Sequence, residues 1–303
     1  MYISPYFLKR AFLHCWPKIF LSTKREQFKS NLRKIPVQQR KFEMASDRLQ
    51  GKTRVDPWAF IRVKDEKVTL LASLNSILPV IHKGVIAYND CTDGSDRIIE
   101  RFCLDNPGFI PFKYPFYVEP AGSRRYETGN LREENTLAAY YNAALEVIPK
   151  NEWIIKIDVD QIYFPRILEH SFFLPKSNKD IVSYSRLNVV RDKNNRVRVE
   201  KYLRPGDHWL IFNDKINFTN VFGYSESGEF YSWEHMQWEG DKNPIFFKPE
   251  CSSLHFPYEK NYRSYMGNPE DLTLLEDFFI SCDKTEFSNE LLNVRSAINM
   301  FEE

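Results

Sequence analysis

Residues 153–160 read Trp-Ile-Ile-Lys-Ile-Asp-Val-Asp, a short apolar run that ends in two carboxylates one residue apart. A run of this kind is typical of a central strand that is covered on both faces of its sheet. Because residues i and i+2 of a strand point to the same side, Asp158 and Asp160 are expected to converge on one cation. Ions such as Mg²⁺ take one or two carboxylates together with phosphate oxygens. The alternative is a solvated turn, since this tripeptide pattern is common by chance.

Toward the N-terminus, strand and helix patterns alternate as far back as Pro57. This β-α-β-α order predicts a parallel sheet with helices on both faces. Ligands of such sheets bind beyond the carboxyl ends of the strands, where this chain has clusters of polar residues. The predicted strands are Trp58–Val63, Gly84–Tyr88 and Phe109–Tyr117, and the predicted helices are Glu66–Ile77, Asp96–Leu104 and Glu133–Ile148.

The pattern is less regular after about residue 175. Ile181–Val190 and Val197–Leu203 predict a hairpin, and His208–Phe212 predicts a further strand. The segment Asn217–Lys242 is rich in glycine, aromatic and acidic residues, and we expect it to be a long functional loop. We expect the tail from Leu272 to be helical.

Charge is distributed unevenly along the 303 residues, although the net charge is only +1. Residues 1–50 contain 11 Lys and Arg against 3 Asp and Glu, whereas the remaining residues contain 31 against 38. The mildly acidic body argues against a broad nucleic-acid surface. The basic arm also contains many aromatic and aliphatic residues, a mixture that can lie on an anionic membrane surface. A helix packed on the body and a partly disordered arm are the alternatives.

Other patterns exclude several classes of protein. The five cysteines are odd in number and widely spaced, without C-x-x-C, which argues against a disulfide framework or a zinc site and favours a reducing compartment. No apolar stretch approaches the roughly 18–20 residues of a transmembrane helix. The glycine-rich phosphate loops of Rossmann dehydrogenases and P-loop enzymes are absent from the sequence.

The most specific strings are Pro57-Trp-Ala-Phe-Ile-Arg-Val-Lys-Asp-Glu66, Gly84-Val-Ile-Ala-Tyr-Asn-Asp-Cys-Thr-Asp-Gly-Ser95, Glu133-Glu-Asn135 with Tyr140-Tyr-Asn142, and Ile155-Lys-Ile-Asp-Val-Asp160. In order and spacing they resemble the bacterial β-1,4-N-acetylgalactosaminyltransferases that build ganglioside-like lipooligosaccharide outer cores. The resemblance runs from about Pro57 to Phe164 and thins afterwards to Gly206-Asp207 and His255-Phe-Pro257.

The resemblance implies an α/β fold with a GT-A-like, Rossmann-type mixed sheet flanked by helices and an acceptor-binding C-terminal half. Residues 1–50 would form the basic arm and 51–303 the glycosyltransferase domain. Within that domain, 57–165 would bind the nucleotide sugar, and 166–303 would hold the acceptor and a C-terminal helix. The implied reaction is an inverting, metal-dependent transfer of N-acetylgalactosamine, or a related hexosamine, from a UDP-sugar to a lipooligosaccharide or other glycan, which forms a β-linkage.

The implied metal is Mn²⁺ or Mg²⁺. By the resemblance, Asp160 would be the direct ligand, and Asp158 would reach the ribose, or the metal through water. Metal-dependent enzymes of this type often add a late histidine, here His255, and imidazole is an acceptable ligand for Mn²⁺. An ordinary, partly buried histidine is the alternative for His255.

Nucleotide recognition is predicted at the first two strand ends. Asp90 and Asp93 lie in a string that resembles the loop by which related transferases hold uracil and ribose, and a carboxylate can accept hydrogen bonds from either. An Asp-Gly turn that caps the next helix is the alternative. Arg62 and Glu66 are also predicted nucleotide contacts, although Arg62 can either bind phosphate as a fork or simply pair with Glu66.

The predicted helix 133–148 carries two further candidates. Asn135 and Asn142 are seven residues apart, so they share one face of that helix. Related transferases present an asparagine from the equivalent helix toward the donor, and a surface stripe is the alternative.

An inverting transfer needs a carboxylate near the acceptor hydroxyl. Asp207 opens a predicted strand and matches the family. Glu234 is flanked by Trp233 and Trp238, which can stack on sugar faces. Both are candidate general bases, and their alternatives are a turn residue for Asp207 and a surface charge for Glu234.

The predicted partners are a UDP-sugar donor, a glycan or glycolipid acceptor and an anionic membrane, without nucleic acid, at the inner face of the cytoplasmic membrane. Another UDP-hexose transferase of the same fold, a nucleotide-sugar hydrolase or a nucleotidyltransferase would use the same carboxylate pair. A carbohydrate-binding protein or scaffold that kept the fold is the non-enzymatic alternative, against which the intact Asp90, Asp158 and Asp160 count.

Overall fold

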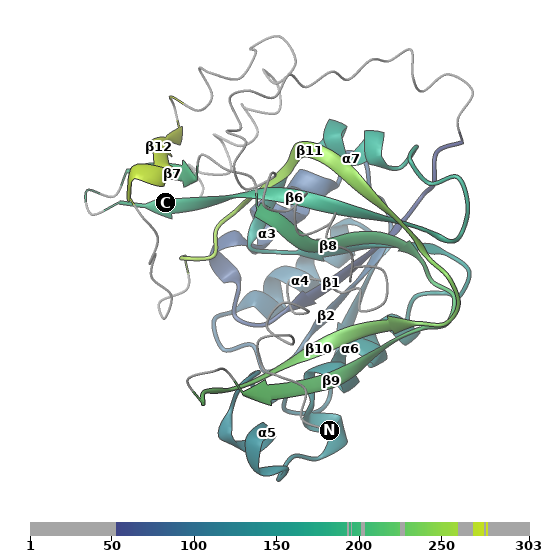
Figure 1. Cartoon of the computed structure of the whole chain (residues 1–303), viewed down its shortest axis with the longest axis vertical. Coiled ribbons are helices and arrows are strands. Elements are labelled where there is room, and N and C mark those ends of the chain that lie inside the picture. The colour runs from purple at the N-terminus through teal and green to yellow at the C-terminus, as the bar shows by residue number, and fades with distance from the viewer. Residues whose placement is uncertain are drawn as a thin grey trace.

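The structure is a computed structural model, and it describes residues 53–192, 194, 196–200, 204–224, 228–259, 269–275 and 277 (Figure 1). For residues 204–207, 244–251 and 269 it describes the backbone alone. The predicted basic arm lies outside these residues, as does most of the predicted C-terminal helix. In this described part, none of the helices combines the length and the apolar character that a membrane span requires.

Four parallel strands form one half of the main sheet, as the sequence predicts. They lie in the spatial order β4-β1-β2-β3 and consist mainly of apolar residues, because helices cover both of their faces. The predicted strands at β1 and β2 are confirmed to the residue, whereas β3 ends at Lys113, earlier than predicted. The bounds are β1 (Trp58–Val63), β2 (Gly84–Tyr88), β3 (Phe109–Lys113) and β4 (Trp153–Asp158).

Further strands continue the sheet beyond β4, so the sheet is mixed. β8 pairs with β4 in antiparallel direction, β6 with β8, β7 with β6 and β12 with β7, and β11 lies parallel to β6 and antiparallel to β5. The predicted hairpin is confirmed by the β6–β7 pairing, and the strand predicted at His208 lies within β8. The bounds are β5 (Gln161–Tyr163), β6 (Asp180–Arg191), β7 (Val197–Glu200), β8 (Arg204–Phe212), β11 (Asn243–His255) and β12 (Leu272–Leu274).

The start of the tail differs from the predicted helix. Leu272–Leu274 form the strand β12, because they complete the backbone hydrogen bonding of the edge strand β7. A short 3₁₀ helix, η4 (Pro269–Asp271), precedes this strand. A pairing between segments so far apart in sequence overrides the local preference of the segment.

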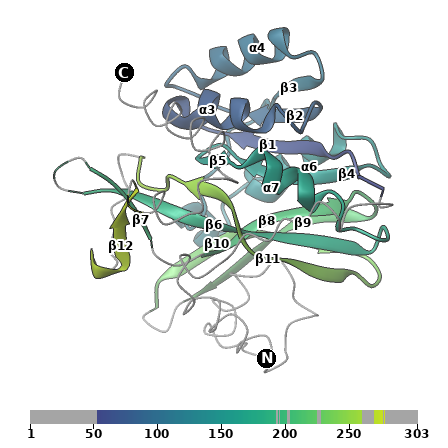
Figure 2. The same cartoon turned by 90° about the horizontal axis from the view of Figure 1, so that it is seen from above.

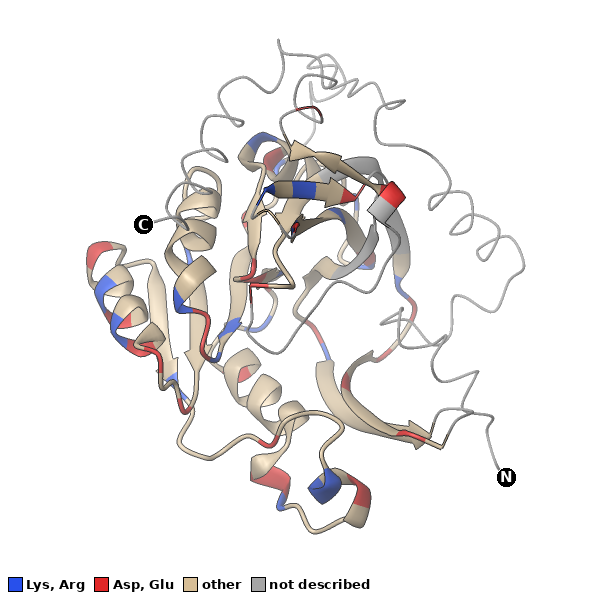
Figure 3. Ribbon diagram, turned by 90° about the vertical axis from the view of Figure 1, so that its left-hand side faces the viewer, with Lys and Arg blue, Asp and Glu red and all other residues tan. Residues whose placement is uncertain are grey.

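Helices cover the two faces of the sheet (Figure 2), and the sheet separates two hydrophobic cores. α3 (Lys67–Ile77), α4 (Ser95–Asp105) and α7 (Pro165–Ser171) contribute to one core, and α6 (Leu137–Glu146) contributes to the other. The outer surfaces of α4 and of α5 (Arg124–Thr128) carry basic and acidic residues side by side (Figure 3). The fold class predicted from the sequence, an α/β mixed sheet flanked by helices, is confirmed.

The helix predicted over 133–148 is divided. A 3₁₀ turn, η3 (Glu133–Asn135), precedes α6, and the Thr136 side chain accepts a hydrogen bond from the Ala139 amide at the start of α6. A threonine at this position satisfies one of the amides that a helix start leaves without a partner. The break places Asn135 outside the helix that carries Asn142.

The prediction of a long loop over Asn217–Lys242 is wrong. This segment forms an antiparallel two-stranded ribbon of β9 (Ile216–Tyr224) and β10 (Phe230–Trp238). Aromatic and β-branched residues recur at alternate positions, which suits a ribbon whose one face is buried. Phe218 and Met236, register partners on that face, belong to the core beneath α6. The ribbon therefore lies against α6 and brings β10 close to the sheet (Figure 1).

Candidate active site

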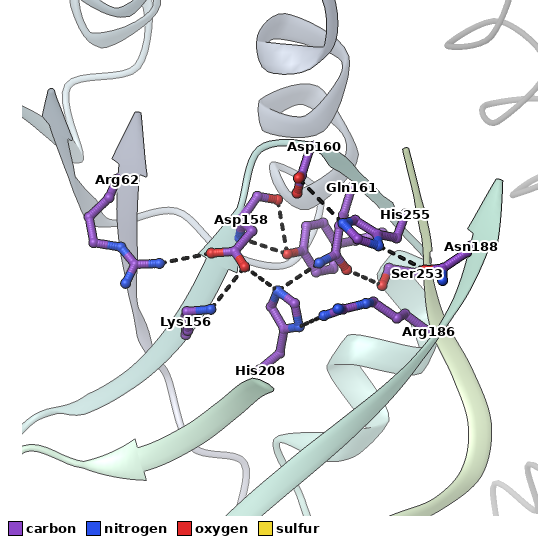
Figure 4. A network of polar contacts seen from close by, with 11 residues as sticks. Arg62, Lys156, Asp158, Asp160, Gln161, Arg186, Asn188, His208, Ser253 and His255 are labelled. Carbon is purple, nitrogen blue, oxygen red and sulfur yellow. Dashed lines mark hydrogen bonds and ion pairs between the residues drawn. The ribbon is translucent and has the colours of Figure 1, made fainter. Parts of the chain in front are cut away.

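Two charged side chains meet at the carboxyl ends of neighbouring parallel strands. Arg62 on β1 and Asp158 on β4 are register partners, and Arg62 Nη2 donates to Asp158 Oδ1 over 2.8 Å (Figure 4). They lie on the sheet face that α6 covers, because Phe60, two residues before Arg62, belongs to the core beneath α6. Polar residues therefore converge where ligands of parallel sheets bind.

Asp158 is surrounded by positive and hydrogen-bonding groups. Its Oδ2 lies 2.8 Å from Lys156 Nζ and 2.9 Å from His208 Nε2. Burial by itself would raise the pKa of Asp158, but Lys156, His208 and Arg62 together hold it well below its ordinary value. Asp158 is therefore ionised, and both of its oxygens contact side chains of the protein.

Arg62 is held rigidly and still has donors to offer. Its guanidinium carbon lies 3.9 Å from the ring centre of Tyr141 and 4.9 Å from that of Phe60, close enough for cation–π attraction to both. The side chain is 6% exposed, and its Nε and Nη1 have no hydrogen-bond partner among the described residues. A buried arginine in this state is suited to an anionic ligand, because unpaired buried donors are costly.

Glu234 lies on β10, on the ribbon face that is turned toward α6. Burial raises the pKa of Glu234, against the opposing effects of Arg62, Lys156 and a hydrogen bond from Tyr141. Burial by itself would lower the pKa of Arg62, but Tyr141, Asp158 and Glu234 together raise it. A second carboxyl group thus faces the arginine, and its raised pKa is the property expected of a catalytic acid or base.

Asp160 and His255 form a separate pair beside this cluster. Asp160 Oδ2 and His255 Nε2 lie 3.3 Å apart. Asn188 Nδ2 donates to Glu200 Oε2 over 3.2 Å, so Asn188 Oδ1 accepts the Nδ1 proton of His255 over 2.8 Å. Burial lowers the pKa of His255, and in the neutral imidazole with this tautomer the Nε2 lone pair faces Asp160. Asp158 and Asp160 therefore have different side-chain partners, and their expected convergence on one cation stays a prediction.

The predicted nucleotide residues after β2 have unequal environments. Asp93 accepts hydrogen bonds from the amides of Ser95 over 2.9 Å and Lys67 over 2.8 Å, so its carboxylate joins the starts of α3 and α4. Burial would raise the pKa of Asp93, but these hydrogen bonds lower it. Asp90 is exposed and adopts a φ of 42°, a left-handed conformation that aspartate tolerates. The carboxylate of Asp90 is therefore accessible to a ligand, whereas that of Asp93 is engaged by backbone amides.

Among the described residues Arg62 pairs with Asp158, not with Glu66 as in the alternative left open by the sequence, and its predicted contact with nucleotide stays a prediction. The Glu66 amide donates to Ser95 Oγ over 2.9 Å, which ties the loop after β1 to the loop after β2. The predicted contact of Glu66 with nucleotide stays a prediction.

The two asparagines are engaged by backbone groups. Asn142 Nδ2 donates to the Phe218 carbonyl over 2.9 Å, and its Oδ1 accepts from the Phe218 amide over 2.7 Å, so this side chain fastens the ribbon to α6. Asn135 Nδ2 donates to the Tyr117 carbonyl over 2.6 Å. Both contacts support a structural role rather than the predicted donor contact. Asp207 lies on β8, but its side chain is outside the described part.

Several members of the site were not predicted from the sequence. The Lys156 side chain is 7% exposed, and a lysine inside an apolar strand two residues before Asp158 is a signal that could have been noticed. His208 was passed over beside the candidate Asp207. Its Nε2 lies 2.7 Å from Gln161 Nε2 and its Nδ1 3.4 Å from Arg186 Nη1, contacts that only the folded sheet creates (Figure 4).

Buried cations and carboxylates at the ends of parallel strands define an α/β protein with a site for a charged ligand. The chain matches, over residues 38–295, the family model described as Beta-1,4-N-acetylgalactosaminyltransferase (CgtA). This match covers most of the chain, so the chain belongs to the CgtA family and is a glycosyltransferase. The family resemblance found in the sequence is thereby confirmed. A comparison with curated proteins found no match.

Solved structures give weaker likenesses. Glucosyl-3-phosphoglycerate synthase from Mycobacterium tuberculosis, in complex with Mn²⁺, uridine diphosphate and phosphoglyceric acid, has a TM-score of 0.29 and 12% identity over 46% of this chain and 45% of that chain. The inositol-1-phosphate CTP transferase from T. maritima has a TM-score of 0.31 and 12% identity over 53% of this chain and 72% of that chain. The chain thus spans less than half the length of the synthase, and TM-scores this low carry no argument about function.

Proposed function

We propose that this glycosyltransferase moves N-acetylgalactosamine, or a related hexosamine, from a UDP-sugar to a lipooligosaccharide or other glycan acceptor, with inversion and formation of a β-linkage. The description of its family supports the sugar and the linkage. The observation that carries the chemistry is that Arg62, a buried cation with unpaired donors, faces Glu234, a carboxyl group with a raised pKa.

The first requirement of the transfer is to neutralise the leaving diphosphate. Arg62 is the residue we assign to this role, because its buried Nε and Nη1 have no partner within the described part of the chain and its planar fork matches two phosphate oxygens. Contacts with Tyr141, Phe60 and Asp158 fix the guanidinium before any ligand arrives. A donor group held in place in this way needs no reorganisation during the reaction.

The second requirement is a divalent metal, which when bound would neutralise charge on the diphosphate. Asp160 and His255 fit this group, since the carboxylate Oδ2 and the Nε2 lone pair face one another at 3.3 Å and Asn188 holds the imidazole from behind. Within the described residues no group of three or more His, Cys, Asp or Glu is arranged for a metal. We therefore propose Asp160 and His255 as the protein ligands, with water and phosphate oxygens as the others.

Asp158 fits a direct metal contact less well, because Arg62, Lys156 and His208 already contact its two oxygens. We propose that its role is to hold Arg62 and to balance the buried positive charge. A contact from Asp158 to the ribose or to metal-bound water stays compatible with this role.

The third requirement is a general base for the acceptor hydroxyl. We propose Glu234, because burial brings its pKa closer to the operating pH and because Trp233 and Trp238 flank it on the ribbon. In the transfer, the acceptor proton passes to Glu234, the acceptor oxygen bonds to the anomeric carbon, and the bond to the diphosphate breaks with its electron pair on the leaving group. Asp207, next to His208 on β8, is the second candidate.

Recognition of the nucleoside is assigned to the loop after β2. Asp90 is the proposed contact to uracil or ribose, because its carboxylate is exposed at the strand end while that of Asp93 joins two helix starts.

We further propose that residues 1–50, with 11 basic against 3 acidic residues, hold the enzyme at the anionic inner face of the cytoplasmic membrane. Deletion of residues 1–45 should then reduce sedimentation with anionic vesicles, and unchanged sedimentation would contradict the membrane role.

The test of the main proposal is UDP release from a series of UDP-sugars, with Mn²⁺ and with purified lipooligosaccharide as acceptor. We expect UDP-GalNAc to be the best donor, with release that depends on both acceptor and metal. Asp160→Ala and His255→Ala should each abolish the metal-dependent rate. Asp105→Ala, which removes an exposed carboxylate on α4, is the matched control and should retain it.

Three outcomes discriminate between the alternatives. Release that is equally fast without acceptor would favour a nucleotide-sugar hydrolase. Turnover that persists in chelator would contradict the metal. Failure to bind UDP in the presence of Mn²⁺, measured by calorimetry, would favour the alternative hypothesis of a non-catalytic carbohydrate-binding protein.

A further inference from the structure

We propose that Tyr141 is a positioning residue that couples Arg62 to Glu234, so that one side chain aligns the donor-binding cation and the general base. The inference rests on the proposed function, in which Arg62 binds the leaving diphosphate and Glu234 accepts the proton of the acceptor. Tyr141 itself touches neither reacting atom in this scheme, and it acts through its two neighbours.

The ring of Tyr141 is the surface on which Arg62 rests. The guanidinium carbon lies 3.9 Å from the ring centre, closer than its 4.9 Å to the centre of Phe60. A planar guanidinium at this distance is attracted by the negative face of the ring. Tyr141 therefore fixes the plane of Arg62, and with it the direction in which the unpaired Nε and Nη1 donate.

Aromatic neighbours hold the ring of Tyr141. It makes edge-on contacts with Phe60 (6.2 Å between ring centres, 82°), with Phe218 (5.2 Å, 82°) and with Tyr140 (6.0 Å, 67°). These rings come from the sheet, from the ribbon and from α6 itself. A ring held from three sides has little freedom to turn, so it can set the position of groups at both its face and its hydroxyl.

Tyr141 also lies beside Glu234. Its ring packs on Phe218, Glu234 is on the same face of the ribbon as Met236, the register partner of Phe218, and each of the two groups raises or lowers the pKa of the other. The other titratable groups that face Glu234 are Arg62 on β1, Lys156 on β4 and Tyr126 on α5. Arg62 and Lys156 attract the carboxylate but also contact Asp158. The Tyr141 hydroxyl is a neutral donor beside Glu234, and its donation would orient the carboxylate and favour the ionised form that a general base requires.

Tyr141→Phe separates the two roles, because it removes the hydroxyl and keeps the ring. Without the donor, ionisation of Glu234 becomes harder, so the acid limb of the rate profile for UDP release from UDP-GalNAc should move to higher pH. A shift of about 0.5–1 pH unit corresponds to a rate that is about threefold to tenfold lower on that limb. The plateau rate should also fall, because the carboxylate loses a group that orients it, whereas the KM for UDP-GalNAc should stay close to that of the wild type because the ring under Arg62 is kept.

Tyr141→Leu removes the ring as well. We expect the same shift of the acid limb, and in addition a KM for UDP-GalNAc that is about threefold to tenfold higher, the loss typical of a partly desolvated cation–π contact. Tyr140→Phe is the control, since it removes a buried hydroxyl from the adjacent residue of the same helix. It should change neither the limb nor the KM.

The outcomes keep this inference apart from the proposed function. If Glu234→Gln is inactive and the profile of Tyr141→Phe coincides with that of the wild type, Tyr141 has no positioning role while the base assignment stands. If Glu234→Gln retains full turnover, the base assignment itself is wrong. Tyr141→Phe decides the question alone should the leucine variant not fold, and thermal melting of each variant checks this.

Discussion

Arg62 and Asp158 occupy register positions on the parallel strands β1 and β4, and a hydrogen bond of 2.8 Å joins them at the carboxyl ends of those strands. The side chain of Arg62 is 6% exposed and that of Asp158 is 25% exposed, so the pair is mostly shielded from water. Lys156 and His208 meet the other oxygen of Asp158. The Asp158 carboxylate thus pairs with the two buried cations Arg62 and Lys156, so we expect the stability of the fold to depend on it.

Asp158→Asn should therefore destabilise the protein strongly. The amide keeps the shape of the side chain but removes the carboxylate that pairs with Arg62 and Lys156 over 2.8 Å each. Removing one partner of a buried pair costs about 3–5 kcal/mol, and the partial exposure of Asp158 lowers our expectation to about 2–4 kcal/mol. Urea denaturation measures this change in the free energy of unfolding.

The matched control is Asp105→Asn. Asp105 pairs with Arg101 on the exposed surface of α4, and such a pair contributes less than about 0.5 kcal/mol. If Asp158→Asn cost no more than this control, the buried charge network would not be a determinant of stability.

Asn142→Ala tests whether the α6 asparagine serves the fold or the donor. Its two hydrogen bonds to Phe218 fasten the ribbon that carries Glu234. Loss of both leaves backbone groups of β9 without these partners and should cost about 1–3 kcal/mol. Turnover should fall because Glu234 is less well placed, while the affinity for UDP with Mn²⁺, measured by calorimetry, should be unchanged. A large loss of UDP affinity would restore the predicted donor contact.

The strands and their polar ends could be predicted because each depends on local sequence. The apolar run before Asp158 and the strand before Arg62 have the composition of covered strands. The partners of these residues could not be predicted in the same way. For Arg62 the sequence offered a phosphate contact or a pairing with Glu66, four residues away, whereas its partner Asp158 is 96 residues away and is set by the register of β1 and β4.

The ribbon is a second case in which tertiary packing, rather than local sequence, determines the structure. Its glycines and acidic residues suggested a loop, yet Ile216 and Phe218, two residues apart and both buried, fit a strand once α6 supplies a surface to pack on. Glu234 was named as a candidate from its tryptophan neighbours alone. Its closeness to Arg62 and Tyr141 depends on how β10 docks, which no local pattern contains.

Asn188→Ala should weaken metal binding without removing a proposed ligand. Asn188 fixes His255 with Nε2 toward Asp160, and the loss of such a supporting hydrogen bond typically lowers metal affinity about 10–100-fold. Mn²⁺ titration of the purified protein in the presence of UDP, followed by electron paramagnetic resonance, measures this affinity. Asn243→Ala, which loses a hydrogen bond to Asp180, is the control. Equal affinities for the two variants would contradict the proposed Asp160–His255 site.

Glu234→Gln should make the protein more stable and inactive, and the gain should depend on pH. Because burial raises the pKa of Glu234 in the folded state, that state binds more protons than the unfolded chain between the two pKa values, so stability falls as pH rises through this window. Glutamine cannot ionise and escapes this loss. Urea denaturation should show equal stabilities at about pH 4, below the ordinary carboxyl pKa, and a variant about 0.5–2 kcal/mol more stable at about pH 7. Glu239→Gln, on an exposed carboxylate after β10, should show no such difference. A Glu234→Gln variant less stable than the wild type at about pH 7 would mean that Arg62 and Lys156 require this charge, and that Glu234 is ionised at no cost to the fold.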